Sequence, residues 1–188
     1  MDPFITTFTG RKVNPLALKS EDISILDIAH HLATLNRFVG ALKRPVSIAQ
    51  HSVFVSRLLV GTLWEREGLF HDAPETYLGD VSKWVKQSPV MAGYREADQN
   101  AWVVICVALH LSVRGTPELN KMIREADDLM VRYENLKQGA QPQHMFELPS
   151  HPRPTEKEVR SVGVWSPWTW RVAEKKFLEH ARLLGFKV

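Results

Sequence analysis

The sequence predicts an all-α protein folded as one compact helical bundle. Apolar residues recur every three or four positions along most of the chain, which is the period of an amphipathic helix. No segment shows the sustained alternation of apolar and polar residues that is typical of a strand. A chain of 188 residues with 44% hydrophobic residues is sufficient for one core, so a single domain over 1–188 is expected.

The first half of the chain reads as short helices separated by turns. An N-terminal extension, residues 1–20, is expected to hold either a small hairpin or only a tail. Ser47 has a side chain that can cap the helix following it. Pro74 marks the start of a new turn. The helices expected here cover residues 25–36, 47–59, 62–73 and 81–87.

The second half contains three longer helices that the sequence predicts. Residues 97–113 are apolar enough to form a buried helix. Thr116 and Pro117 are a cap and a first-turn proline, and the apolar residues that follow predict a helix to about residue 136. Residues 138–160 are rich in proline and polar residues, so they are expected to form a surface loop. A last helix is expected from Ser166 onward, with Phe177 on its apolar face.

Composition narrows the class of protein. A net charge of +3 is too small to indicate nucleic-acid binding, so no nucleic-acid partner is expected. No stretch approaches the ~20 apolar residues of a membrane span, and no signal peptide is recognisable. Cys106 is the single cysteine, which excludes an intrachain disulfide and favours a reducing, cytoplasmic location. Aromatic residues near the C-terminus favour a homo-oligomer that buries them between subunits.

Three expected helices carry polar groups that point inward. His51 lies on the apolar face of its helix, and Asp127 lies at the edge of another apolar face. His71 and Glu75 are four positions apart and share a face if the helix continues through Pro74. A lone inward histidine is usually a core residue, but several inward polar groups are costly to bury without partners. One divalent cation would satisfy them together, and mixed imidazole and carboxylate ligands suit Zn, Mn, Fe, Co or Ni rather than a pure magnesium site.

These residues resemble the HD-domain phosphohydrolases, whose motif is a His, then His-Asp, then Asp on a helical domain. The segments 35–38, 47–53 and 71–80 look like the bacterial 5'-deoxynucleotidases. They look still more like the short bacteriophage members that include dATP triphosphohydrolases, and so do 7–11 and 165–167. The similarity covers most of the chain. The resemblance implies a protein located in the cytoplasm of a bacterium or of an infected bacterial host. It also implies that the protein controls a nucleotide pool during phage replication.

The resemblance also implies roles for individual residues. The metal ligands would be His51, His71, Asp72 and Asp127. Glu75 would be the catalytic acid, and Lys86 would contact the phosphates. Arg37 would grip a phosphate and Phe38 would stack on the base, both assigned by motif. The sequence departs from the family at three places, and one of them is the spacing from Arg37 to His51, which differs by one residue from that of the nucleotidases. The family more often has tryptophan where Phe38 stands, and Trp84 replaces a smaller residue and would narrow the pocket.

The expected activity is metal-dependent hydrolysis of a deoxynucleoside triphosphate, with dATP as the first candidate, to deoxynucleoside and triphosphate. Zn, Co or Mn would be the cofactor, joined by Mg when a triphosphate binds. A 5'-deoxynucleotidase that releases phosphate from monophosphates is the near alternative. A non-catalytic nucleotide- or partner-binding domain with the same helical fold is the alternative from a different class.

Overall fold

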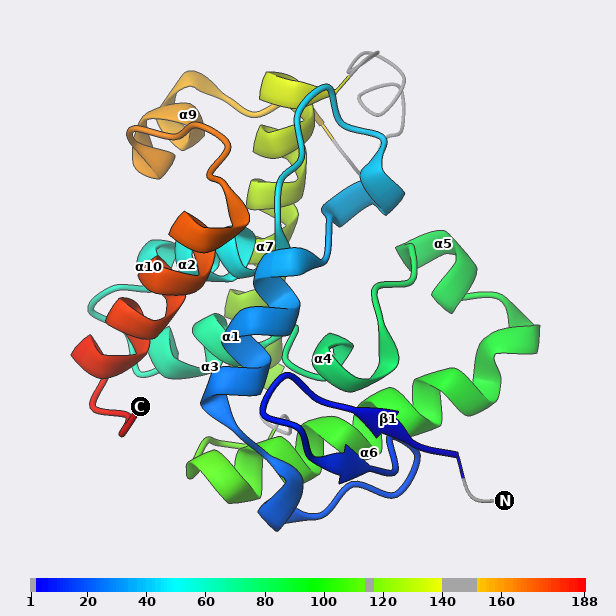
Figure 1. Cartoon of the computed structure of the whole chain (residues 1–188). Coiled ribbons are helices and arrows are strands. Elements are labelled where there is room, and N and C mark those ends of the chain that lie inside the picture. Colours follow the sequence, from blue (N-terminus) through cyan, green and yellow to red (C-terminus); the bar gives the residue numbers. More distant parts are fainter. Residues whose placement is uncertain (1–2, 114–116, 140–151) are drawn as a thin grey trace.

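The structure is a computed structural model that describes residues 3–113, 117–139 and 152–188. It is mostly helical, which confirms the all-α prediction (Figure 1). The α-helices are α1 (Ile25–Thr34), α2 (Ile48–Leu58), α3 (Glu65–Phe70), α4 (Glu75–Leu78), α5 (Lys83–Lys86), α6 (Ala92–Leu109), α7 (Pro117–Gln138), α9 (Glu156–Val162) and α10 (Trp170–Leu183). Short 3-10 segments are η1 (Ser20–Asp22), η2 (Arg37–Gly40) and η3 (Pro89–Met91).

The N-terminal residues form the small hairpin that the sequence left open. Strand β1 (Ile5–Thr6) pairs antiparallel with β2 (Lys12–Val13), with Ile5 opposite Val13. The hairpin is tied to α1 because Asp27, fully buried in its first turn, accepts from the backbone N–H of Thr9 at 2.7 Å and from its hydroxyl at 2.8 Å. The N-terminal extension is therefore part of the folded domain.

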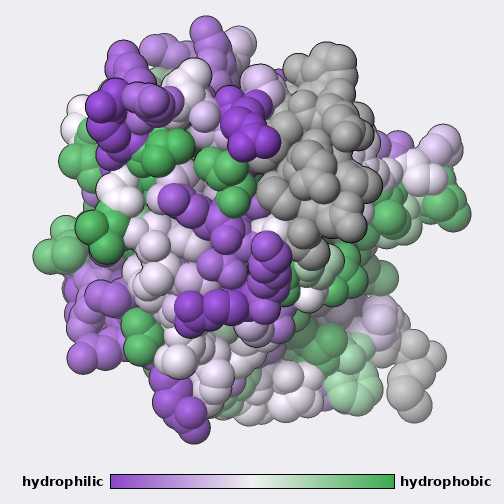
Figure 2. All heavy atoms as spheres, turned by 90° about the horizontal axis from the view of Figure 1, so that it is seen from above, coloured by the Kyte–Doolittle hydropathy of each residue, from purple (hydrophilic) through white to green (hydrophobic). Residues whose placement is uncertain are grey.

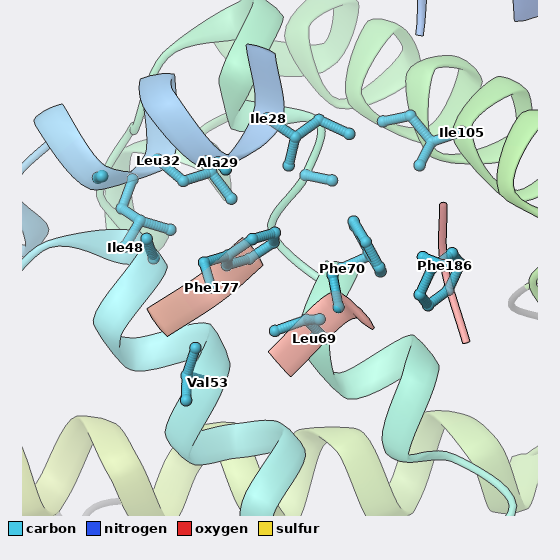
Figure 3. Packing of buried hydrophobic residues seen from close by; sticks show 14 of the residues in the cluster. Ile28, Ala29, Leu32, Ile48, Val53, Leu69, Phe70, Ile105, Phe177 and Phe186 are labelled. Atoms are coloured by element: carbon cyan, nitrogen blue, oxygen red, sulfur yellow. The ribbon is translucent and has the colours of Figure 1, made fainter. Parts of the chain in front are cut away.

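Helix α2 lies at the centre of the molecule. Every residue from Ile48 to Ser56 is buried, because α2 packs against α1, α3, α7 and α10. On one side lies the larger apolar cluster, where Phe177 of α10 meets Phe70 of α3 edge to face at 5.5 Å (Figure 3). On the other side, α2 packs against α7 and α9 around Met130, which is fully buried. Polar residues of α2 therefore lie between two apolar layers, where each needs a partner.

Four predicted boundaries were wrong. The third helix ends at Phe70, and a turn through Pro74 separates α3 from α4, so the helix does not continue unbroken. Helix α6 begins at Ala92, five residues earlier than expected, and ends at Leu109, four residues earlier than expected, with His110 as its C-cap. It is not a buried helix, because Val107 on its outer face is 57% exposed. The last helix begins at Trp170, capped by Thr169, rather than at Ser166.

The prediction of a surface loop over 138–160 is wrong from residue 156 onward, where helix α9 begins. Thr155 caps α9 by accepting from the backbone N–H of Glu158, whose carboxylate accepts from the Thr155 N–H. Val159 and Val162 then pack against the cluster around α7. The remainder of the expected loop, residues 140–151, and the expected cap at Thr116 lie outside the described residues.

The outer surface is mixed in character. On the face shown in Figure 2, hydrophobic residues lie in separate groups between hydrophilic ones. No helix among the described residues combines the length and apolar character needed to cross a membrane. The expected homo-oligomer stays a prediction.

Candidate metal centre

The four predicted ligands come together from three parts of the chain. His51 comes from α2, His71 and Asp72 from the turn after α3, and Asp127 from α7. Nε2 of His51 lies 3.0 Å from Oδ1 of Asp127 and 3.9 Å from Oδ2 of Asp72. Nε2 of His71 lies 3.1 Å from Oδ2 of Asp72 and 3.9 Å from Oδ1 of Asp127. These are the separations expected between ligands that share one cation.

The other nitrogen of each imidazole fixes how the ring is turned. Nδ1 of His71 lies 2.9 Å from the carbonyl oxygen of Gly68, which can only accept, so this Nδ1 carries a proton. Nδ1 of His51 lies 3.1 Å from Oε1 of Glu134 and donates to that carboxylate. In neutral rings the lone pairs are then on the two Nε2 atoms, which face the carboxylate oxygens of Asp72 and Asp127.

Four lone pairs that converge at such distances repel one another unless a positive charge lies between them. His51 is fully buried, and its Nε2 makes no hydrogen bond of acceptable geometry among the described residues. His51, His71 and Asp127 each offer a ligand atom, and these atoms lie within 4.8 Å of one another. Asp72 is not one of these three residues, but its Oδ2 lies 3.1 Å from Nε2 of His71 and 3.9 Å from Nε2 of His51, so it is a candidate fourth ligand. The residues therefore fit a divalent cation bound by two nitrogens and two oxygens.

Without a cation, a proton takes its place. Burial and the Arg37 guanidinium both lower the pKa of His51, but the carboxylates of Glu134 and Asp127 outweigh them and raise it to about 9. Burial acts to raise the pKa of Asp127, yet His51 and His71 hold it below its usual range. The site thus favours a protonated imidazole beside ionised carboxylates when it holds no metal.

Arg37 and Glu134 form a second layer behind the ligands. Glu134 is fully buried on α7, and its Oε2 accepts from Nε of Arg37 at 2.8 Å. The other guanidinium nitrogens lie 3.5 Å from Oδ2 of Asp72 and 4.0 Å from Oδ1 of Asp127. Arg37 thus lies beside the candidate ligands, and its expected contact with a phosphate stays a prediction. The sequence analysis missed Glu134, although it follows Asp127 by seven positions and therefore shares its helix face.

The backbone beside Arg37 is unusual. Phe38 and Val39 both have left-handed conformations, with φ of 55° and 53°. This is rare for a β-branched residue such as Val39, and such strain is found most often at functional sites. The Phe38 ring lies 5.6 Å from Cζ of Arg37 and is half-buried. Phe38 is therefore adjacent to the site through Arg37.

Glu75 and Lys86 form a pair at the edge of the site. Although the helix breaks after His71, Glu75 at the start of α4 is still buried. Nζ of Lys86, on α5, donates to Oε1 of Glu75 at 2.9 Å. Burial, followed by the charge of Asp72, raises the pKa of Glu75 to about 8 against the opposing effect of Lys86. A carboxyl with this pKa can hold a proton near neutral pH, as a general acid must.

Two further residues lie around this pair. Asp80 was missed in the sequence analysis. Burial and Asp72 raise its pKa, while the charges of Arg37 and Lys86 lower it, so its charge interacts with those of the site. Trp84 is 58% exposed on α5, two residues before Lys86.

Comparison with known proteins gives relatives but no activity. No family model matches the chain. Uncharacterized protein RCAP_rcc00048 of Rhodobacter capsulatus is 32% identical over 134 residues, covering 67% of this chain and 68% of that protein. Uncharacterized protein YfdR of Escherichia coli K12 is 32% identical over 131 residues, 70% of each chain. The chain therefore belongs to the family that includes RCAP_rcc00048 and YfdR.

Proposed function

We propose that this protein is a metal-dependent phosphohydrolase of deoxynucleotides. The observation that carries the proposal is the convergence of two imidazole nitrogens and two carboxylate oxygens on one point. The ligands would be His51, His71, Asp72 and Asp127. A Zn, Co or Mn ion held there would lower the pKa of a bound water and polarise a phosphoryl oxygen.

Arg37 would bind the phosphate part of the substrate. Its Nε is held by Glu134, which leaves the remaining N–H groups on the side of Asp72 and Asp127. A guanidinium presented in this way suits a phosphoryl group that also contacts the cation. Lys86 supplies a second positive charge near the same place, because its Nζ lies beside the buried Glu75. Together the positively charged side chains of Arg37 and Lys86 would stabilise the negative charge that develops on the phosphoryl oxygens.

Glu75 would supply the proton that the reaction needs. In the proposed reaction a water oxygen bonds to the α-phosphorus, and the bond from that phosphorus to the 5'-oxygen breaks. The 5'-oxygen then requires a proton to leave as a hydroxyl, and the proton released by the water returns to the carboxylate. With a pKa of about 8, Glu75 is suited to both transfers near neutral pH.

The substrate class rests on the sequence resemblance to the HD-domain phosphohydrolases. The segments around Arg37, His51 and His71 look like those of the deoxynucleotidases and the phage triphosphohydrolases. We propose a deoxynucleoside triphosphate as the substrate, with dATP first, and deoxynucleoside and triphosphate as products. Phe38, beside Arg37, would stack on the base.

A product assay tests the proposal. The protein loaded with Mn, Co or Zn is given the four deoxynucleoside triphosphates, the four monophosphates and ribonucleotide controls, and products are separated by ion-pair chromatography. Deoxynucleoside plus triphosphate is the expected result. We expect Asp127→Asn to abolish it and the matched variant Asp128→Asn to keep it, because Asp128 pairs with the surface Lys83.

Two other outcomes would change the assignment. Orthophosphate released from monophosphates would make the protein a 5'-deoxynucleotidase. Nucleotide binding without turnover, for every metal tried, would contradict an enzyme and favour a binding domain.

A further inference from the structure

We infer that Glu134 is a positioning residue that holds both the metal ligand His51 and the anion-binding Arg37. The inference rests on the proposed metal site and assigns it one more residue. Glu134 is fully buried on α7, and its two oxygens have different partners. Oε1 lies 3.1 Å from Nδ1 of His51, and Oε2 lies 2.8 Å from Nε of Arg37.

The first contact sets the tautomer of the ligand. A carboxylate can only accept, so Nδ1 of His51 keeps its proton and Nε2 presents its lone pair to the cation. The negative charge also makes the imidazole a stronger donor to the metal. Because His51 and Glu134 are both fully buried, water cannot replace this contact without opening the interface between α2 and α7.

The second contact, between Glu134 and Arg37, fixes the position of the guanidinium. It also reduces the repulsion between the charge of Arg37 and a bound metal ion. The guanidinium lies 3.5 Å from Asp72 and 4.0 Å from Asp127, so it competes with a cation for both carboxylates. Glu134 binds Nε of the guanidinium at 2.8 Å, and its negative charge offsets the positive charge of Arg37. Without this carboxylate, an uncompensated positive charge would lie beside a divalent cation.

A purely structural role for Glu134 makes a different prediction. Helices α2 and α7 also meet through apolar residues, among them Phe54, Val55, Met130 and Tyr133. If Glu134 only joined the helices, its replacement would lower thermal stability and leave the metal affinity of the folded protein unchanged. Metal affinity therefore separates positioning from structure.

The test compares Glu134→Gln with Glu125→Gln, a control on the same helix whose side chain is 66% exposed. Binding of Co²⁺ alone to the full chain is measured by calorimetry, with circular dichroism as a check on folding. The loss of such an outer partner typically weakens metal binding 10- to 100-fold, so a Kd raised by about this factor is expected for Glu134→Gln. Glu125→Gln is expected to bind as the unchanged protein does. A folded Glu134→Gln with an unchanged Kd would overturn the inference.

A second measurement needs no variant and applies if Glu134→Gln fails to fold. Imidazole ¹⁵N spectra of the unchanged protein with Zn²⁺ report which nitrogen of His51 carries the proton. The inference expects a protonated Nδ1 and a metal-bound Nε2, and the reverse would overturn it. If neither Zn²⁺ nor Co²⁺ binds to the protein, this result would overturn both this inference and the proposed metal site. Metal binding without turnover would contradict the proposed function alone.

Discussion

The affinity of the site for metal should rise steeply with pH, because a proton and the cation compete for Nε2 of His51. The His51 pKa of about 9 means that the metal-free site is almost fully protonated at pH 7. Removing that proton at pH 7 costs about 3 kcal/mol, or about 100-fold in affinity, from two pKa units at 1.36 kcal/mol each. At pH 8.5 the loss of affinity caused by this proton falls to about fourfold. The Kd for the metal should therefore drop about 25-fold between pH 7 and pH 8.5.

Calorimetric titration with Mn²⁺ under nitrogen measures this directly. Repeating it in buffers with different ionisation enthalpies counts the protons released. At least one proton per metal ion is expected at pH 7. A Kd that does not change between pH 7 and 8.5, with no proton release, would refute the assignment of His51 as a ligand in competition with a proton.

The metal-free protein should become less stable at higher pH, because it loses the same proton from His51. The folded pKa of His51 lies above its ordinary value of 6.5, so the stabilisation that it provides is complete below pH 6.5 and is lost as the pH rises through 9. The raised pKa of Glu75 acts in the same direction, over a range that ends near pH 8. The Tm of chelator-treated protein should therefore fall between pH 7 and 9.

Two further variants separate catalysis from folding. Glu75→Gln should keep the Co²⁺ affinity and lose turnover by about 100-fold or more, because an amide cannot transfer the proton; turnover within threefold of the unchanged protein would exclude Glu75 as the acid. Phe177→Ala should lower the free energy of unfolding by about 3–5 kcal/mol, because it leaves a cavity against Phe70. Leu183→Ala, at an 83% exposed position of the same helix, should change it by less than about 0.5 kcal/mol in a urea titration. Equal losses for the two α10 variants would contradict the described core.

The helical class could be predicted because it depends on local periodicity. The apolar spacing of α1 and α10 matches the faces that the structure buries, whereas α2 is buried on all sides from Ile48 to Ser56. The start of α6 could not be predicted from the sequence, because the first turns of this helix are exposed and carry no apolar repeat. The capping box of Thr155 and Glu158 was present in the sequence, but the surrounding polar and proline residues favoured a loop.

The proximity of the candidate ligands could be predicted because these residues combine a motif with helical spacing. His51 and Asp127 point inward by periodicity, and the resemblance supplied Asp72. Glu134 was missed because a carboxylate on a long charged helix usually belongs to a solvated face. Its role depends on the approach of Arg37, which is 97 positions away in the sequence. No local pattern reports such a contact.

The pairing of Glu75 with Lys86 also depends on tertiary structure. Helix α3 ends at Phe70, and the turn through Pro74 places Glu75 at the start of α4, where its carboxylate accepts from Lys86 of α5. The sequence predicted that Glu75 would share a helical face with His71 if one helix continued through Pro74. The role of Glu75 stays a prediction, and the continuous helix that this geometry required is wrong, because α3 ends at Phe70.

The most direct test of the metal centre is an anomalous difference map from crystals grown with Mn²⁺ or Zn²⁺. The structure predicts one strong peak about 2.0–2.3 Å from Nε2 of His51, from Nε2 of His71 and from the carboxylates of the two aspartates, Asp72 and Asp127. No peak at this point with millimolar metal, or one that uses other ligands, would contradict the account.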